Sequence, residues 1–509
     1  MCTVEVGAAR PQSTGEATLR GTSSYSSADT LSANPAIIRD EEAAIGFEPL
    51  TKEEVISSQV QQASLGSTDP TAPPNPGELA LPRYAKVRYA IFTIYRRLFS
   101  IVFLANFAVF ITVVIRDRTL ADYVNAAAAN LLGVGLARQP LAVNLMFKCA
   151  CAVPSSAPLR LRRLAAKIFH YGGVHSGCGV AAVMWYIAFV GILTKEAITS
   201  ATARLASPAI VVLAWLILLL LLAIVIAAYP AFRFKRHDYF ELTHRFSGWL
   251  AIALFWPLLL LYVEKARQAE HHSFGITLVK LPAFWILVVL TLSIIHPWLY
   301  LRKVPVNAEY ISPHAIRLHF NFATIKFGQA FAISKNPLRD WHGFAQFRDI
   351  EGPDKFSCLV SKAGDWTSDC IARPPTHVWK RGIPAFGVGY VMKMFRSFIM
   401  VATGSGIGPC LSFLALENRP PLRVVWQTRS PLKTYGKGVL NSVKVLDPDP
   451  IVLDTTHTGR QDIFPMVLDL VKTFKAEAVL VVSNPIFTRK MVFDLESRGV
   501  PAYGPIFDS

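Results

Sequence analysis

Five stretches of the chain are each long and apolar enough to cross a lipid bilayer, and they limit the folds open to it. A membrane-spanning helix needs about 20 consecutive, mostly apolar residues. Hydrophobic residues make up 52% of the 509 residues and the mean hydropathy is +0.36, which is too apolar for a soluble protein of this length. The chain is therefore predicted to contain a helical membrane domain. The five stretches are 90–115, 168–193, 208–228, 239–263 and 281–300.

A sixth apolar stretch, 121–153, is interrupted by Arg138, Gln139 and Pro140, so hydropathy alone leaves its course open. Basic groups resolve it, because Lys and Arg gather on the cytoplasmic side of membrane helices. All four basic groups share one side only if this stretch crosses once. We therefore expect six spans, both termini in the cytoplasm and a plasma-membrane location. The groups are Arg96 with Arg97, 160–163 with Lys167, 233–236, and Arg302 with Lys303.

Lys and Arg outnumber Asp and Glu by 52 to 35, which gives a net charge of +17. Because these cations stand beside the apolar stretches and not in one basic tract, membrane anchoring accounts for them and no nucleic-acid partner is expected. The seven cysteines form no C-x-x-C pair and no disulfide framework.

Residues 1–84 are rich in Ser, Thr, Ala and Pro and contain no apolar stretch of membrane length, so we expect a disordered tail. The tail is either without function or a phosphorylated regulatory segment. The chain starts with no charged and apolar leader, so the first membrane helix is expected to direct insertion.

After the membrane domain, 85–303, the apolar pattern changes twice. Alternating residues at 315–322 and 355–364 indicate antiparallel strands, and 304–395 is predicted as one domain of such strands. From 396 to 509, apolar strands alternate with helical patterns. This order predicts a doubly wound α/β domain, which binds ligands at the carboxyl ends of its parallel strands.

A glycine turn follows the first strand of that last domain. Residues 398–402 form a short apolar run typical of a buried strand. Glycines let the backbone turn sharply and approach a ligand, and the free amides of a helix start attract phosphate. We interpret the turn as a pyrophosphate cradle. Its residues are Gly404, Ser405, Gly406, Ile407, Gly408 and Pro409.

Several motifs in order resemble the ferredoxin-reductase superfamily: GDWT at 364–367, the glycine turn, WQTRS at 426–430, GRQD at 459–462 and the terminal aromatic Phe507. Together with the membrane stretches, they resemble its ferric-reductase and NADPH-oxidase branch. Residues 86–509 are most similar to fungal integral membrane proteins of the TmpA type. The resemblance implies a β-barrel that holds FAD, followed by a domain that binds NAD(P)H.

On the flavin side, the resemblance implies roles for four residues. His342 and Phe344 match the His and Phe of the ferric-reductase flavin motif, but Ala345 stands where the family has a hydroxyl. Trp366 is either part of the flavin enclosure or a core aromatic. Arg381 either neutralises the FAD pyrophosphate or lies in a solvated loop.

On the nicotinamide side, Arg429 stands where the family contacts the adenosine ribose or its 2′-phosphate, and a surface arginine is the alternative. Gly459 and Arg460 of the GRQD motif are assigned to the same cofactor. Ser483 replaces the cysteine that the family places beside the nicotinamide. Phe507 either stacks on the flavin or docks in the core. Ser483 and Phe507 are the two expected catalytic positions.

In the same branch, two haems lie between the third and fifth spans, held by histidines about 13 residues apart because about 20 Å of helix rise separates them. The third span here has His170 and His175, the fifth has His244, and no histidine follows at that spacing. A two-haem chain is therefore excluded. Either one haem lies between His244 and one of the other two, or all three are polar residues near lipid headgroups.

Two functions remain open at this point. The first is a membrane flavoenzyme that passes hydride from NAD(P)H to FAD and then to an unknown electron acceptor, with the cofactors carrying the chemistry. The second is a non-catalytic membrane regulator with a degenerate reductase fold, which Ala345 and Ser483 favour. For TmpA-type proteins the resemblance implies developmental signalling in asexual sporulation, which suits either function.

Overall fold

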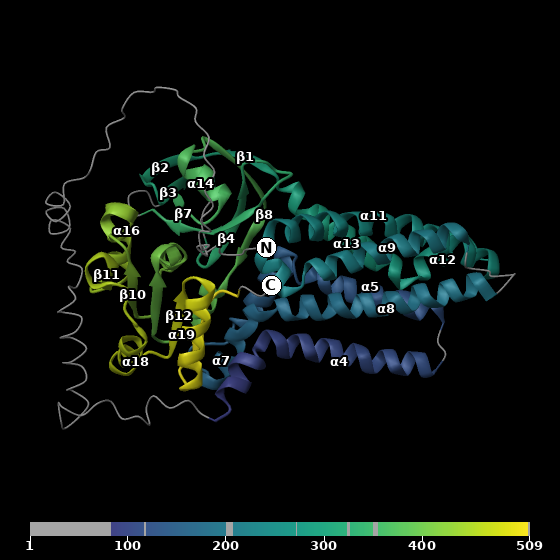
Figure 1. Ribbon diagram of the computed structural model, residues 1–509, viewed down its shortest axis with the longest axis horizontal. Coiled ribbons are helices and arrows are strands. Elements are labelled where there is room, and N and C mark those ends of the chain that lie inside the picture. Colours follow the sequence, from purple (N-terminus) through teal and green to yellow (C-terminus); the bar gives the residue numbers. More distant parts are fainter. Residues whose placement is uncertain are drawn as a thin grey trace, which may run out of the picture.

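The computed structural model describes residues 83–116, 119–199, 207–270, 272–322, 326–349 and 355–506. The long helices lie side by side along the long axis of the molecule, and the three sheets gather at one end of them (Figure 1). The predicted tail at 1–84 and Phe507 lie outside the described residues, apart from the tail's last two positions.

The helical bundle contains five helices that are long and apolar enough to cross a membrane. A sixth span results if the bent pair α5 and α6 counts as one. All five expected stretches are helical, and α11 runs several residues beyond the predicted end. The helices are α4 (Ile94–Ile115), α5 (Leu120–Leu136), α6 (Pro140–Ala150), α7 (Leu159–Ala165), α8 (Gly172–Thr199), α9 (Pro208–Ala227), α10 (Pro230–Lys235), α11 (His237–Glu270), α12 (Phe274–Lys280) and α13 (Pro282–Leu299), with short turns η1 (Lys86–Ile91) and η2 (Ala166–His170).

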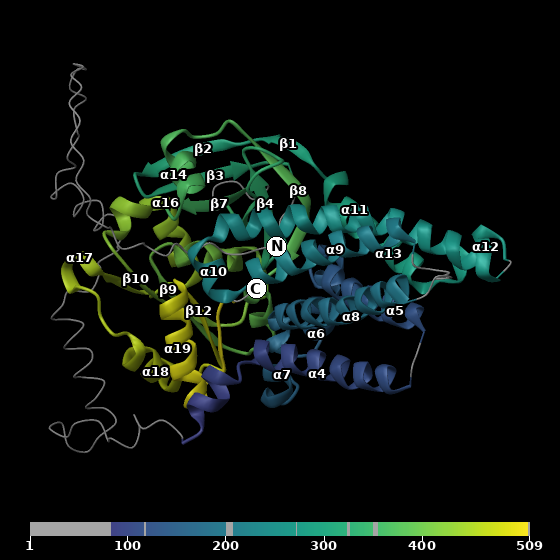
Figure 2. The same ribbon diagram turned by 45° about the vertical axis from the view of Figure 1, so that its right-hand side comes forward.

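The interruption noted at Arg138 is a sharp bend. Helices α5 and α6 meet there at 74°. Gln139 is the N-cap of α6, its side-chain oxygen accepting from the Leu141 amide at 2.6 Å, and Pro140 fits the first turn because it needs no hydrogen-bond donor there. As a result α6 turns out of the bundle and lies against a strand of the sheets, β8 (His377–Phe386), instead of continuing along α5 (Figure 2).

The next region, the antiparallel domain, consists of two four-stranded sheets with one shared core. Their strand orders are β1-β8-β4-β5 and β2-β3-β7-β6, with every pairing antiparallel as predicted. Phe320, Phe331 and Phe356 from both sheets pack together at the centre. The strands besides β8 are β1 (Arg302–Pro305), β2 (Asn307–Ser312), β3 (Ala315–Phe320), β4 (Gln329–Ser334), β5 (His342–Ala345), β6 (Phe347–Arg348) and β7 (Phe356–Ser361), followed by helix α14 (Asp365–Ala372).

The α/β domain has a five-stranded parallel sheet with the order β11-β10-β9-β12-β13. The connections run outward in both directions from β9, so the strand order reverses between β9 and β12. Met400 and Trp426 face α16, while Ile399 and Val401 face α18 and α19. The elements are β9 (Phe398–Thr403), α15 (Ile407–Cys410), β10 (Leu422–Thr428), α16 (Pro431–Leu446), β11 (Ile451–Asp454), α17 (Thr455–Thr458), α18 (Phe464–Thr473), β12 (Ala478–Val482), α19 (Pro485–Ser497) and β13 (Ala502–Tyr503), with 3₁₀ turns η3 (Val388–Met394), η4 (Gly404–Gly406) and η5 (Leu411–Ala415).

Specific polar contacts join the bundle to both sheet domains. Arg162 on α7, whose side chain is only 3% exposed, forms a bidentate ion pair with Glu477 at 2.5 and 3.0 Å, and this contact lowers the pKa of Glu477. Lys167 contacts Glu496 at 2.9 Å. The Asn144 side chain on α6 donates to Pro384 O and accepts from Phe386 N, both at 2.9 Å. Basic residues that sequence analysis assigns to membrane topology therefore also dock the α/β domain.

Candidate functional site

The site is built around the glycine turn, which leaves β9 at the point where the strand order reverses. Gly404 has a φ of +50°, which an L residue rarely adopts, and its carbonyl accepts from Trp426 Nε1 at 2.9 Å. Trp426 of the WQTRS motif thereby holds the turn in place through this hydrogen bond. Ser405 and Pro409 keep part of their surface exposed, whereas Gly406, Ile407 and Gly408 are buried.

Gly406 is a packing position. A Cβ atom at this residue would lie 2.0 Å from Val482 O on β12, and both are backbone-anchored. Glycine is therefore needed here for the turn to approach the neighbouring strand. A valine at Gly406 would therefore clash with protein backbone and disturb the fold itself.

Ser483, the expected catalytic residue, follows β12 at the same edge of the sheet. Its side chain is fully buried, and its hydroxyl contacts the hydroxyl of Thr403 at the end of β9. Asn484 then caps α19 by accepting from Phe487 N at 3.0 Å. The structure places Ser483 at the expected edge, where its hydroxyl bridges the two central strands.

The predicted adenosine-side residues lie together at the carboxyl ends of β10 and β11. Arg429, Gly459 and Arg460 are all exposed. Beneath them, Asp454 accepts from the amides of Ser430 and Thr456 at 2.8 Å each, which fixes both loop starts. Two exposed arginines next to a rigid, hydrogen-bonded edge suit a phosphate group.

A cavity opens where the three regions meet. Its volume is about 1150 Å³, open solvent at its mouth included. The turn contributes Pro409, the antiparallel domain contributes Ala345 and Phe386, and the bundle contributes Phe147 from α6. Residues 505 and 506, just before Phe507, also line it. The walls are mostly apolar, aromatic or glycine, which is the composition of small-molecule sites of this size.

Three other predicted flavin-side residues lie together and are not among the cavity's described lining residues. His342, Phe344 and Trp366 stack on one another, with ring centroids 4.5 Å apart for His342 and Trp366 and 5.8 Å for Phe344 and Trp366. The buried Trp366 Nε1 makes no hydrogen bond in the described part of the chain. Ala345 points into the cavity with its neighbours on β4 and β8, so strand alternation separates it from the stack.

Arg381 takes a different position. Its guanidinium lies over the rings of Trp341 and Trp298, at 4.5 and 5.1 Å, so it joins the antiparallel domain to α13. Burial, reinforced by the nearby Arg245 charge, lowers the pKa of Arg381 to about 10. The structure thus brings Arg381 to the bundle interface and not to the glycine turn.

Two of the three histidines meet inside the bundle. The rings of His175 and His244 have centroids 6.1 Å apart, and His175 Nδ1 is 3.1 Å from Val134 O, which leaves its Nε2 available. Neutral imidazoles are common metal ligands, so these two side chains are the pair that would hold a single haem. His170 instead packs against Phe169, with ring centroids 4.3 Å apart.

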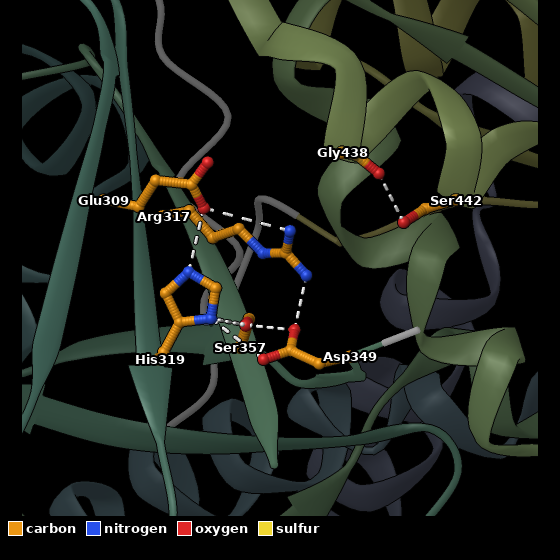
Figure 3. A network of polar contacts seen from close by, with 7 residues as sticks. All are labelled: Glu309, Arg317, His319, Asp349, Ser357, Gly438 and Ser442. Atoms are coloured by element: carbon orange, nitrogen blue, oxygen red, sulfur yellow. Dashed lines mark hydrogen bonds and ion pairs between the residues drawn. The ribbon is translucent and has the colours of Figure 1, made fainter. Parts of the chain in front are cut away.

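A polar network of the antiparallel domain lies next to α16 (Figure 3). His319 lies between Asp349 and Glu309, at 2.9 Å from each, and its contact with Asp349 raises the pKa of His319. Arg317 and Ser357 also contact Asp349. A Cβ atom at Gly438 of α16 would lie 3.0 Å from Arg317 Nη1, so the network abuts the helix that begins beside Arg429.

Sequence reasoning missed several residues of this site. Asn144, Phe147 and Glu477 carry no local signal, because their partners lie in other domains. Arg138, which lines the cavity, did carry one: a charge inside an apolar stretch marks a functional position more often than a structural one. Phe507 lies outside the described residues.

Comparison with known proteins defines the C-terminal part of the chain first. Residues 388–509 match the family described as "Adenylate-forming reductase 03009, C-terminal domain". Adenylate-forming reductases 03009 and 06235 of Coprinopsis cinerea are each 43% identical to this chain over 424 and 425 residues, or 83% of it. The chain spans 41% of the length of these relatives.

Among solved structures, a flavohemoglobin from Malassezia yamatoensis with bound FAD and heme overlaps 76% of this chain and 98% of its own, with 13% identity and a TM-score of 0.36. A ferredoxin-NADP+ reductase from Plasmodium falciparum overlaps 40% of this chain and 95% of its own, with 13% identity and a TM-score of 0.32. With 13% identity and TM-scores below 0.5, these two likenesses carry no further argument.

Proposed function

We propose that the chain is a membrane-bound oxidoreductase that takes hydride from NAD(P)H and passes electrons through FAD to an acceptor. The observation that carries this proposal is the cavity at the junction of the three regions. It lies next to the edge where the strand order of the parallel sheet reverses, which is where such sheets bind nucleotides. The relatives' name couples adenylate formation with reduction, and reduction is the part that this cavity supports.

The cavity fits a flat ring cofactor. Phe147, Phe386 and Phe169 offer aromatic faces, and Gly387 and Gly389 allow close approach of the backbone. FAD, when bound, would supply the acceptor ring for hydride. His342, Phe344 and Trp366 stay candidates for the flavin side on the family resemblance alone, and Ala345 would border the ring without offering a hydrogen bond.

The chain's own residues would then position NAD(P)H. The glycine turn would receive the pyrophosphate, while Arg429, Gly459 and Arg460 would hold the adenosine end. Ser483 would border the nicotinamide through its backbone, since its hydroxyl is committed to Thr403. Orientation in a water-excluding pocket is the main contribution that a protein makes to hydride transfer.

Purification of the full chain in detergent tests this function. We expect a yellow protein with flavin absorbance that NADPH bleaches under anaerobic conditions. Calorimetric titration with FAD, NADH and NADPH should give at least one saturable binding curve. Absence of flavin and of binding by all three compounds would exclude the enzyme.

We also propose a single haem between His175 and His244, supported by their ring separation. A pyridine haemochrome assay should then give one haem or fewer per chain, and His244→Ala should remove it. Two haems per chain would contradict the spacing argument.

The alternative is a non-catalytic membrane regulator. Two observations favour it: the methyl of Ala345 faces the cavity, and Ser483 is fully buried. A role in fungal developmental signalling rests on the resemblance to TmpA-type proteins alone and is compatible with either function. Flavin reduction by NADPH in the purified protein separates the two.

The membrane arrangement is part of the proposal. Six spans, with α5 and α6 as one bent span, both termini in the cytoplasm and a plasma-membrane location are supported by the length of the helices and by the basic groups. An impermeant thiol reagent should therefore fail to label a cysteine added before Lys86 in intact cells. Labelling there would exclude this topology.

A further inference from the structure

Among the described residues that line the junction cavity, Arg138 is the one charged side chain. It stands at the 74° bend between α5 and α6, and it is half-buried. Without the bend it would continue along α5. The bend brings a membrane-domain cation to the space that the two sheet domains enclose.

In the described part of the chain, the Arg138 side chain makes no hydrogen bond and no ion pair. Its surroundings add no negative charge: Tyr95, Tyr171 and the cation Arg233 are its electrostatic neighbours, and its own charge acts on His175 and His244. An uncompensated cation in an apolar environment costs several kcal/mol. Such a charge persists in a membrane domain mostly where it serves a ligand.

The other residues of the cavity wall indicate the shape of that ligand. Phe147, Phe169 and Phe386 contribute aromatic side chains to its wall, and Gly387 leaves open space beside its backbone. These walls suit a flat, apolar ring system, while the single guanidinium suits one negative charge on it. A compact inorganic anion would leave the aromatic walls without a partner.

We propose that Arg138 receives the negative charge that a flavin ring acquires on reduction. The inference rests on the function proposed above and extends it to a residue of the membrane domain. A hydride from a reduced nicotinamide brings two electrons and one proton, so the ring gains one net negative charge. Arg138 favours that anionic form, because the guanidinium keeps its own proton at any physiological pH. It is a positioning and electrostatic residue, and the membrane domain thereby adjusts how easily the flavin is reduced.

The test compares Arg138→Gln and Arg138→Lys with the wild type, all as full chains in detergent. Arg236→Gln, an exposed cation at the same end of the bundle, is the matched control. The probes are FAD and riboflavin, each titrated in oxidised and reduced form by fluorescence or absorbance. We expect Arg138→Gln to lower the preference for reduced over oxidised flavin about tenfold, a fall of about 30 mV for a two-electron couple. Arg138→Lys should keep most of the preference, and the control should keep all of it.

A second measurement needs no variant. The reduced ring in the wild type should keep its anionic absorbance spectrum at a pH where free reduced riboflavin is already protonated. A neutral reduced spectrum in the wild type at that pH would overturn the proposal, whether or not Arg138→Gln folds.

Other outcomes separate the alternatives. If the wild type binds no flavin, the proposed enzyme itself is excluded. If flavin binds and Arg138→Gln keeps the full preference, only the role of Arg138 is overturned. An effect on FAD that is absent with riboflavin would assign the cation to a phosphate, and loss of haem with unchanged flavin would assign it to a haem carboxylate; both overturn the proposal.

Discussion

The helical bundle and the α/β domain both contain strongly apolar segments, but several of these segments differ sharply in burial. None of the apolar window of α4 is buried inside the protein, and only 17% of that of α13 is, whereas every residue of β12 is buried. The apolar residues of the α/β domain find their partners within the chain. Many of those on the bundle helices instead stay exposed on its outer surface. Hydropathy therefore identifies the environment of a segment, and it does not show which side chains meet.

The sharpest test of this contrast is Gly406→Val. The Cβ atom of the added side chain would lie 2.0 Å from Val482 O, which is protein backbone in the interior of the domain and cannot easily move aside. We expect the free energy of unfolding of the α/β domain to fall by more than about 3 kcal/mol, so that the domain no longer stays folded. Thermal unfolding of the detergent-solubilised chain measures it. Gly364→Ala, with nothing within 4 Å of its Cβ, is the control and should be neutral. A valine variant with unchanged unfolding temperature would contradict the packing assignment.

The contact between the two regions is tested by Arg162→Ala. This change leaves Glu477 without its partner and should weaken docking by about 3 kcal/mol. Hydrogen exchange at 394–396 should rise, because Met394 O also accepts from Arg162. Adding Glu477→Ala should cost less than the sum of the two single changes. The exposed neighbour Arg160→Ala should change nothing, and equal exchange in both arginine variants would argue against docking.

A smaller effect is expected at the solvent edge of the α/β domain. Arg429→Ala should weaken the binding of NADPH more than the binding of NADH, by about 1 to 3 kcal/mol, because only NADPH carries the 2′-phosphate. Titration calorimetry with both nucleotides measures the difference. Lys490→Ala, an exposed cation on α19, is the control. An equal loss for both nucleotides would place Arg429 elsewhere in the site.

The smallest effect concerns pH and the network of Figure 3. Asp349, and then Glu309, raise the folded-state pKa of His319 above its usual 6.5. The stabilisation is therefore complete below pH 6.5 and is lost as pH rises through the raised pKa. We expect the free energy of unfolding of the antiparallel domain to fall by about 1 kcal/mol over that range.

His319→Asn should remove this pH dependence of the free energy of unfolding. At acid pH the variant should still lose stability as pH falls, because Asp349, whose pKa is lowered in the folded state, then becomes protonated. Urea unfolding at a series of pH values measures both. A slope that persists in His319→Asn would assign the effect to another group.

Much of the fold follows from local pattern. The strand at 398–402, the alternation of strands and helices after 396 and the break at Arg138–Pro140 are all present, because each depends on neighbours within a few residues. The site depends on distant ones. Asn144 meets Pro384 across 240 positions and Arg162 meets Glu477 across 315, and no periodicity records such pairs.

The glycine turn shows the same limit within a single motif. Its position was predictable, since three glycines after an apolar run require a turn. The sequence alone could not predict that Gly406 approaches protein backbone, because its neighbour Val482 lies on a strand that is distant in sequence. Arg381 is a second case: its residue type suits a phosphate, and only the fold places it between Trp298 and Trp341.

The basic segment around Arg162 has a consequence for the order in which the molecule is made. Ribosomes synthesise the bundle before the α/β domain, so Glu477 and Glu496 do not yet exist when α7 emerges. In the membrane arrangement proposed above, these cations would be free during insertion to be held at the anionic cytoplasmic leaflet. Once synthesis ends, the same side chains would change partners from lipid to protein. Orientation during biogenesis and assembly of the finished molecule therefore draw on one set of charges at two different times.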